Sequence, residues 1–369
     1  MIDLNKYSKH IILTIIGLSV LLGLGLAYRN IVLDNSFRFS ALLDDRYIFN
    51  TNGESFSDSE IKEIIETKYF NNHTLIVGIL VEFVSLSGTN IAFLIFLTLK
   101  ITFIFLIFKF FKRYINENKS TLNGILLLFA SSSFFISTSN YLLDIFSFII
   151  FGIMLLYKAK SFNTIINADS NSNYGNLIHY NIFNGLINGF LAFVFSYINP
   201  INIVLVPLFG ISGNMLKKKY TLTYFITFIL LNLIFYSVYD YNLIKSFDFI
   251  IETNHFDVPN LFILKNYLGL LVFMFLFYYL MIFKKWKSGI SGLINFEIYY
   301  SLLIFIILTF NSNYFLNMYI FTMLFVVITP YISNVLTYYK NSDSENNKAI
   351  LNFFVLYFLI NLYLVSNFF

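Results

Sequence analysis

The sequence predicts an all-α polytopic membrane protein, and two features carry this prediction. Hydrophobic residues make up 58% of the 369-residue chain and charged residues only 12%, with a mean hydropathy of +0.73. These values lie far outside the range of soluble globular domains. The apolar residues also fall in runs close to the length of about 20 residues that one membrane-crossing helix needs. We therefore expect a single membrane domain over residues 1–369, with about eleven transmembrane helices.

The predicted spans begin with residues 11–28, which follow two lysines near the N-terminus. This run is longer than the apolar core of a signal peptide and lacks a cleavage site, so we take it as an uncleaved first span. The other spans are expected at residues 91–108, 122–138, 141–157, 182–197, 199–213, 221–239, 266–283, 293–310, 315–338 and 349–367. They leave two prominent polar loops between them, residues 29–90 and 240–265.

The segment 73–87 decides the topology, because it is apolar but short and contains Glu82. If it crosses the membrane, every later basic loop changes sides. If it is a re-entrant or interfacial helix, 16 of the 24 Lys and Arg residues fall on one side, seven fall on the other, and Lys100 lies within a span. We choose the second arrangement. The positive-inside rule then places the N-terminus and the basic loops in the cytoplasm.

Both prominent polar loops are extracytoplasmic in this topology. In the first, residues 29–90, Ser57 and Glu60 form a capping box ahead of a stripe of isoleucines, which predicts amphipathic helices at the membrane surface. The second covers residues 240–265. We expect an integral protein of the cytoplasmic (inner) membrane, or of the endoplasmic reticulum membrane in a eukaryote, in contact with the lipid bilayer. The net charge of +4 gives no indication of a nucleic-acid partner.

The adjacent Asp44 and Asp45 are the first candidates for chemistry, since their loop is bounded by the apolar runs 41–43 and 47–49. Carboxylates in such a setting at a membrane surface suit general-base catalysis. With Asp144 as a third ligand, they would also suit a hard divalent cation such as Mg²⁺ or Mn²⁺. The alternatives are that the loop acids are simply solvated and that Asp144 caps its helix.

Lys100 is the second candidate, because it lies in the middle of the predicted span 91–108. An ionised side chain at membrane depth is costly and is a functional hypothesis by default. It would pair with an acid of the outer loop, with a phosphate, or with a buried carbonyl. The chain contains no cysteine, which excludes thiolate chemistry, and its four histidines are scattered. It also has neither a glycine-rich phosphate loop nor a nucleophile elbow.

The order of these features resembles the GT-C superfamily of membrane glycosyltransferases, which includes protein O-mannosyltransferases and lipid A aminoarabinose transferases. In that family a first span leads into an outer loop with an acidic pair shortly before a tyrosine. The matching run in this chain is Asp44, Asp45, Arg46 and Tyr47. A short outer helix follows in the family, opened by a His-Pro-Pro-Leu-like segment. Here His73 opens such a helix, and Gly88 closes it.

The resemblance continues through roughly the first 215 residues. The family places a basic residue in the first half of the next span, matched by Lys100, and an acid after a polar stretch, matched by Asp144. Paired spans with a proline between them correspond to residues 185–207. Three features depart from the family pattern: no Pro-Pro follows His73, Asn199 replaces a frequent lysine, and Asn313 precedes Tyr314 where an Arg-Tyr is usual.

The resemblance implies an inverting transfer of sugar from a polyprenyl-phosphate donor to a glycan, lipid or protein acceptor. Asp44 or Asp45 would be the catalytic base. Positive charge for the departing phosphate would come from a divalent cation held by Asp44, Asp45 or Asp144, or from basic residues. The residues implied in substrate binding are Arg29, Arg38, Tyr47, His73, Lys100, Lys245 and Lys265.

Two other functions remain open at this point. A surface polysaccharide polymerase or ligase would use a lipid-diphosphate glycan and would need a basic outer cavity, whereas the predicted outer loops hold more acids than bases. A transporter or lipid flippase would have two related halves and polar residues at mid-membrane. The sequence shows no repeat of that kind, so we rank the transporter third.

Overall fold

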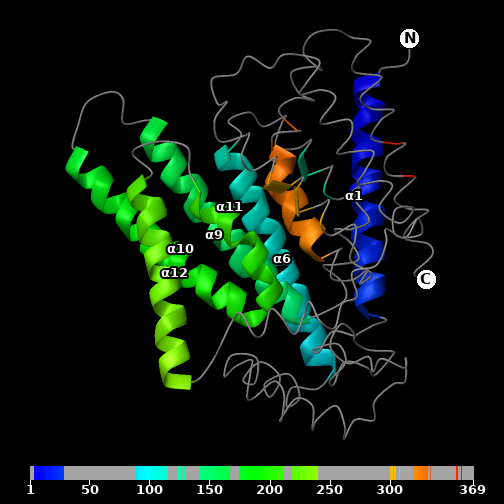
Figure 1. Cartoon of the computed structure of the whole chain (residues 1–369). Coiled ribbons are helices and arrows are strands. Elements are labelled where there is room, and N and C mark those ends of the chain that lie inside the picture. Colours follow the sequence, from blue (N-terminus) through cyan, green and yellow to red (C-terminus); the bar gives the residue numbers. More distant parts are fainter. Residues whose placement is uncertain are drawn as a thin grey trace, which may run out of the picture. The chain divides into compact units, whose positions relative to one another are not determined.

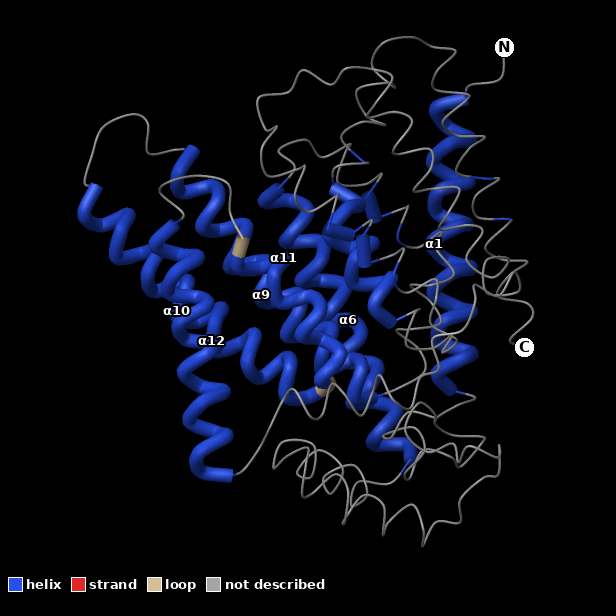
Figure 2. The backbone as a smooth tube through the Cα atoms, viewed as in Figure 1, coloured by secondary structure: helices blue, strands red, loops and turns tan. Residues whose placement is uncertain are grey.

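The structure is a computed structural model. It describes residues 4–28, 89–114, 142–166, 174–211, 218–239 and 319–330, with isolated helical positions at 124–125, 128, 300–301, 303–304, 307, 333, 355 and 359. Apart from Asn199 and Ile211, all these residues are helical (Figure 2). Among these residues, three helices are long and apolar enough to cross a membrane: Phe93–Lys112, Asn181–Ile198 and Lys218–Val238. The protein is therefore a helical membrane protein, as predicted; the expected total of about eleven spans extends over residues outside this set.

The chain divides into two compact units. Unit 1 comprises Met1–Arg29, Ile115–Asn140 and Phe256–Phe369, and unit 2 comprises Asn30–Tyr114 and Tyr141–His255. The predicted outer loop 240–265 lies outside the described residues, and so does the predicted loop 29–90 as far as residue 88.

Unit 1 contains helix α1, Leu4–Tyr28. Its 25 residues make a helix about 37 Å long, more than the roughly 30 Å of a membrane's apolar core. It starts ahead of the predicted span 11–28. Leucines 13, 18 and 21 are exposed on it, whereas Ser19 is buried. A second helical stretch of unit 1, Tyr319–Pro330, is buried along its whole length.

The part of unit 2 that the structure describes contains four long helices (Figure 1). These are α6 (Thr89–Tyr114), α9 (Leu142–Ile166), α10 (Tyr174–Ile198) and α12 (Lys218–Tyr239). Each overlaps a predicted span but is longer, because the backbone hydrogen bonds of a helix continue past the apolar run that the sequence pattern detects. The largest extensions are at the end of α9 and the start of α10.

The predicted span 199–213 differs from what the structure shows. A 3₁₀ helix, η5 (Pro200–Leu205), is followed directly by the short α-helix α11 (Val206–Gly210). The extended backbone of Asn199 ends α10, and its side chain caps η5. Pro207 interrupts the backbone hydrogen bonds, since it has no N–H. Together η5 and α11 are about 20 Å long, too short to cross the membrane's apolar core.

Ring contacts give the relative directions of the first three long helices. The rings of Phe103 and Phe148 are 5.1 Å apart, and a Cβ on Gly152 would lie 3.1 Å from the Cβ of Leu106. Residue numbers therefore rise together, and α6 and α9 are parallel. Phe151 instead contacts Phe195 at 6.2 Å, while Asn188 bonds to the carbonyl of Met154. Helix α10 is therefore antiparallel to α9.

Helices α10 and α12 are parallel and pack closely through small residues. A Cβ on Gly189 would lie 2.6 Å from the carbonyl of Tyr224 and 2.8 Å from the Cβ of Thr227. Farther along, the rings of Phe193 and Phe235 are 4.8 Å apart. Glycines four residues apart, here Gly185 and Gly189, let two membrane helices approach in this way. Because two consecutive long helices run the same way, the chain between them must return, and η5 and α11 form the first part of that return.

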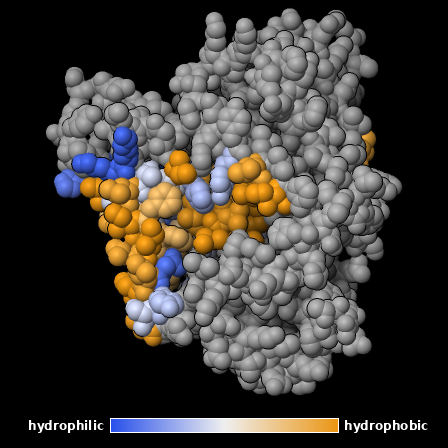
Figure 3. Space-filling model, viewed as in Figure 1, coloured by the Kyte–Doolittle hydropathy of each residue, from blue (hydrophilic) through white to orange (hydrophobic). Residues whose placement is uncertain are grey.

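The outer surface of α12 is apolar, as expected for a helix in contact with lipid. Figure 3 shows hydrophobic side chains along this helix, with hydrophilic ones at its Lys218 end. The exposed apolar residues include Leu222, Ile226, Ile229, Leu230, Leu233 and Ile234. In water such a surface would favour aggregation. The lipid bilayer is the environment that it fits.

Candidate functional site

Two of the sequence-predicted site residues lie in the described helices, Lys100 in α6 and Asp144 in α9. The other eight lie outside the described residues: Arg29, Arg38, Asp44, Asp45, Tyr47, His73, Lys245 and Lys265. The described part of the candidate site therefore contains Lys100 and Asp144 of the ten predicted residues.

Lys100 is a buried lysine in the interior of unit 2, with 8% of its surface exposed. It lies seven residues after Phe93, where the candidate span begins, and therefore about 10 Å along the span. Its Nζ is 5.7 Å from the centre of the fully buried Phe96 ring, one turn earlier in α6. A cation over an aromatic face gains electrostatic stabilisation where water is excluded.

The packing of α6 against α9 places Lys100 and Asp144 at the same height, that is, at the same level along the axes of the two helices. Phe103 contacts Phe148. Lys100 precedes Phe103 by three residues, and Asp144 precedes Phe148 by four. Since the two helices are parallel, these backbone positions lie level with each other. Asp144 also lies in the first turn of α9, where the helix dipole favours a carboxylate.

Buried polar residues of α9, α10 and η5 occupy the same height. The contacts of α9 with α10 place Ser147 level with the end of α10, where Ser196 and Asn199 lie. Asn202 follows in η5 and donates from Nδ2 to the carbonyl of Phe195 at 2.8 Å. We call these residues, together with Lys100 and the backbone position of Asp144, the Lys100 layer; its buried side chains are Lys100, Ser147, Ser196, Asn199 and Asn202.

The Lys100 layer can bind a polar group inside an apolar unit. The hydroxyl oxygens of Ser147 and Ser196 are buried and have no hydrogen-bond partner among the residues that the structure describes. Buried polar atoms normally find a partner, so these hydroxyls are available to a ligand or to water. The cation of Lys100 adds attraction for an anion, which a low dielectric strengthens. The set is suited to a phosphate or to the hydroxyls of a sugar.

Metal binding through the predicted carboxylates depends on the outer loop. Within the described helices no group of three His, Cys, Asp or Glu residues could hold a metal ion. Asp144 is placed on α9, whereas Asp44 and Asp45 lie outside these helices.

A second polar cluster, the Lys158 junction, lies near the other end of unit 2. It consists of Lys158, Asn188, Tyr220 and Tyr224, all buried. Asn188 Nδ2 donates to the hydroxyl of Tyr220 at 2.6 Å and to the carbonyl of Met154 at 3.2 Å. The Tyr220 hydroxyl then donates to the carbonyl of Phe209 at 3.1 Å.

The Lys158 junction was not predicted from the sequence. Lys158 was expected in a cytoplasmic loop that follows the span 141–157, but α9 continues to Ile166, and Lys158 Nζ donates to the carbonyl of Leu208 within the unit. One signal was present in the sequence. Asn181, Asn184 and Asn188 recur on one helical face, at and just before the predicted span 182–197, a spacing that indicates a buried polar stripe.

Comparison with protein families, with curated proteins and with solved structures finds no match to this chain. The basis for a function is therefore the order of spans and motifs in the sequence, together with the two polar clusters of unit 2.

Proposed function

We propose that this protein is an integral-membrane inverting glycosyltransferase that transfers a sugar from a polyprenyl-phosphate donor at the extracytoplasmic face. The observation that carries the proposal is the shared height of Lys100 and Asp144 on two packed parallel helices. The sequence resemblance assigns these two residues to one site although 44 positions separate them. In the predicted topology their end of unit 2 faces outward, on the same side as the loop with Asp44 and Asp45.

The reaction assigned to this site needs a base and a stabilised leaving group. The acceptor hydroxyl attacks the anomeric carbon, forming the new glycosidic bond, while the bond from that carbon to the donor phosphate oxygen breaks. Asp44 or Asp45 takes the hydroxyl proton, and the polyprenyl phosphate leaves with the bonding electrons. Attack on the face opposite the phosphate inverts the anomeric configuration.

Positive charge near the phosphate stabilises the transition state, where negative charge grows on the leaving oxygen. Lys100 supplies such a charge from within unit 2, and Arg29, Arg38, Lys245 and Lys265 are proposed to supply it from the outer side. The carboxylates of Asp44, Asp45 and Asp144 suit Mg²⁺ or Mn²⁺ chemically. Such an ion, when bound, would add Lewis-acid stabilisation of the phosphate.

The acceptor is proposed to bind on the loop side of the same site. Tyr47 and His73 provide hydrogen-bonding groups for a sugar or hydroxyl there. The acceptor class, a glycan, a lipid or a protein, would be set by these loop residues.

One observation favours the transporter or lipid flippase, which the sequence alone ranks third. The broken segment formed by η5 and α11, with buried asparagines beside it, resembles the discontinuous helices that hold substrates in secondary transporters. This reading needs no catalytic carboxylate in the outer loop.

The test is sugar transfer by membranes that contain the protein, supplied with labelled polyprenyl-phosphate sugars. Wild type should transfer label, whereas Asp44→Asn or Asp45→Asn should lose transfer by about 10²-fold or more. Asp248→Asn, a change of another predicted outer acid, is the matched control and should keep wild-type transfer. Adding a chelator measures metal dependence.

Two outcomes would reject the proposal. If folded wild type transfers no sugar from any polyprenyl-phosphate donor, the transferase is wrong and lipid-diphosphate donors and transport assays come next. If wild type transfers sugar but both Asn variants keep full activity, the assignment of the base is wrong.

A further inference from the structure

The end of α11 is held by side chains from two other helices. Lys158 of α9 donates to the carbonyl of Leu208. Tyr220 and Tyr224 of α12 donate to the carbonyls of Phe209 and Val206, at 3.1 and 2.9 Å. A backbone bond from the N–H of Ile211 to the carbonyl of Pro207 closes the end of the helix. Three of the carbonyls of this short helix are therefore satisfied by side chains.

These carbonyls lie inside the candidate spans. The return runs antiparallel to α10, because Asn202 contacts Phe195 while Phe209 and Asn188 share the Tyr220 hydroxyl. Asn188 is seven residues into the span Asn181–Ile198, or about 10 Å from its start. By this measure the carbonyl end of α11 lies inside the candidate span of α10, whereas Tyr220 and Lys158 lie near the ends of the apolar stretches Lys218–Val238 and Ile145–Ala159. The junction is therefore inside the apolar thickness but close to one end of it.

The carbonyl end of α11 and the ammonium group of Lys158 would each be unfavourable here without a partner. A carbonyl without a partner at membrane depth is unfavourable, and the end of a helix carries partial negative charge. An ammonium group at the same depth is also unfavourable unless it meets negative charge. Lys158 is 9% exposed, and its contact with the Leu208 carbonyl resolves both problems together.

We propose that the ammonium of Lys158 is a built-in cation at the carbonyl end of a broken membrane segment, and that it fixes Pro200–Gly210 against α9. Tyr220 and Tyr224 add neutral donors from α12. The other end of the same segment carries Asn199 and Asn202 of the Lys100 layer, so the junction also sets the height of that turn. The inference stands on the contacts of unit 2 and does not depend on the proposed transferase activity.

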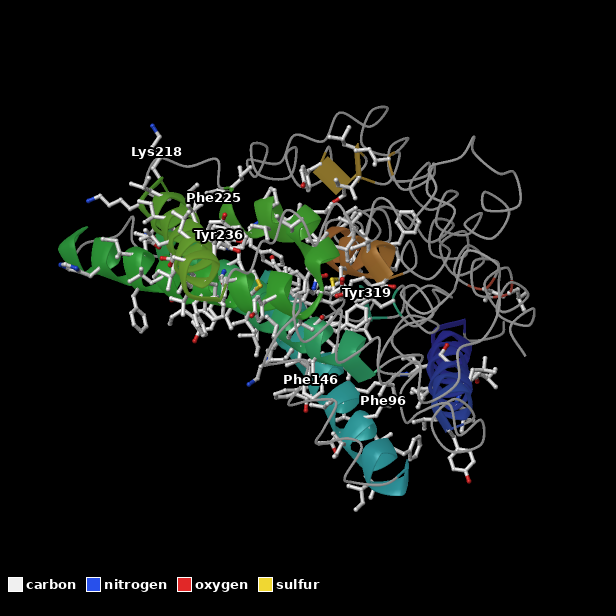
Figure 4. The ribbon with its side chains drawn as sticks, turned by 60° about the horizontal axis from the view of Figure 1, so that its bottom comes forward. Phe96, Phe146, Lys218, Phe225, Tyr236 and Tyr319 are labelled. Atoms are coloured by element: carbon white, nitrogen blue, oxygen red, sulfur yellow. The ribbon has the colours of Figure 1, made fainter. Side chains whose placement is uncertain are left out.

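The first experiment asks whether a free amine can replace the side chain. The full-length protein is purified in detergent, and its thermal unfolding is followed for wild type, Lys158→Ala and Lys218→Ala. Lys158→Ala should unfold at least about 5 °C lower, and ethylammonium chloride should restore half of that loss or more. Tetramethylammonium chloride at the same concentration should restore nothing, because it has no N–H to donate. Lys218→Ala, a change at the exposed end of α12 (Figure 4), should unfold like wild type.

The second experiment measures the position of the segment. The chain has no native cysteine, so Ile211→Cys introduces a single thiol next to α11. Its labelling by a membrane-impermeant maleimide should be slow with Lys158 present and at least tenfold faster with Lys158→Ala or Lys158→Gln. The glutamine keeps a neutral donor but removes the charge, and it serves as the test if the alanine variant does not fold.

Thermal unfolding and maleimide labelling together test the proposal. Faster labelling in Lys158→Gln, with amine rescue of Lys158→Ala where that variant folds, supports a built-in cation. Labelling of Lys158→Gln as slow as with Lys158 would overturn it, since a neutral donor would then suffice. A loss of stability in Lys158→Ala that ethylammonium and tetramethylammonium restore equally would also overturn it.

Discussion

At the scale of single residues, two lysines of the described helices lie in the interior, and their surroundings differ. Lys100 lies against an aromatic ring, whereas Lys158 meets the carbonyl end of a short helix. The sequence singled out Lys100 because it lies in the middle of an apolar run. The buried position of Lys158 was not predicted, because this lysine lies at the end of such a run, where a lysine side chain normally reaches water.

Replacing Lys100 tests its role in the proposed transfer. Lys100→Met keeps the length of the side chain and removes the charge, so we expect sugar transfer to fall by roughly 10²-fold while the protein still folds. Lys109→Met is the matched control on the same helix, where the exposed Lys109 lies 4.4 Å from the Phe105 ring. Equal transfer by the two variants would remove Lys100 from the site.

Gly189 is predicted to be sensitive to a single added methyl group. Gly189→Ala would place a Cβ 2.6 Å from the carbonyl of Tyr224, and we expect a loss of about 1–3 kcal/mol in unfolding free energy. Gly17→Ala in α1 meets nothing within 4 Å and should be neutral or stabilising by up to about 1 kcal/mol. Denaturant unfolding in detergent measures both, and equal effects would contradict the close packing of α10 on α12.

At the scale of elements, the break between α10 and α12 is the feature that shapes unit 2. Asn199 and Pro200 end α10, and Pro207 interrupts the return. The apolar run over 199–213 predicts one span, because hydropathy records how apolar a segment is but not whether its backbone bonds are continuous. The donors that make the break tolerable come from α9 and α12, far from it in the sequence.

Removing one of these donors should destabilise the break. Tyr220→Phe leaves the Phe209 carbonyl without its side-chain donor and ends the bond to Asn188. We expect the free energy of unfolding to fall by about 1–3 kcal/mol. Tyr236→Phe on the same helix removes an exposed hydroxyl and should cost almost nothing. Thermal unfolding of the two variants side by side tests this, and similar midpoints would show that the Tyr220 bonds contribute little.

At the scale of the whole molecule, the predicted topology and the helix directions of unit 2 agree. Parallel α6 and α9, with α10 and α12 running the opposite way, is the pattern that the predicted order of spans requires. The sides of the membrane come from the distribution of lysine and arginine alone.

Cysteine labelling tests those sides directly, because the native chain has no cysteine. Ser57→Cys and Ser246→Cys should react with an impermeant maleimide added outside intact cells. Ser344→Cys should react only after the membrane is opened, since residues 340–348 are predicted to be cytoplasmic. The reverse pattern would invert the topology and move the Lys100 layer to the cytoplasmic side.

The class of the protein follows from its amino-acid sequence, because apolar runs near 20 residues dictate helices in a membrane without reference to one another. Lys100 and Asp144 were likewise identified as unusual from their positions in such runs. Three features were decided by the tertiary structure alone. Lys100 and Asp144 lie at the same level along their helix axes, the segment 199–211 is not one continuous helix, and Lys158 points into unit 2. Each of these depends on contacts between helices distant in the chain, and a hydropathy pattern carries no information about such contacts.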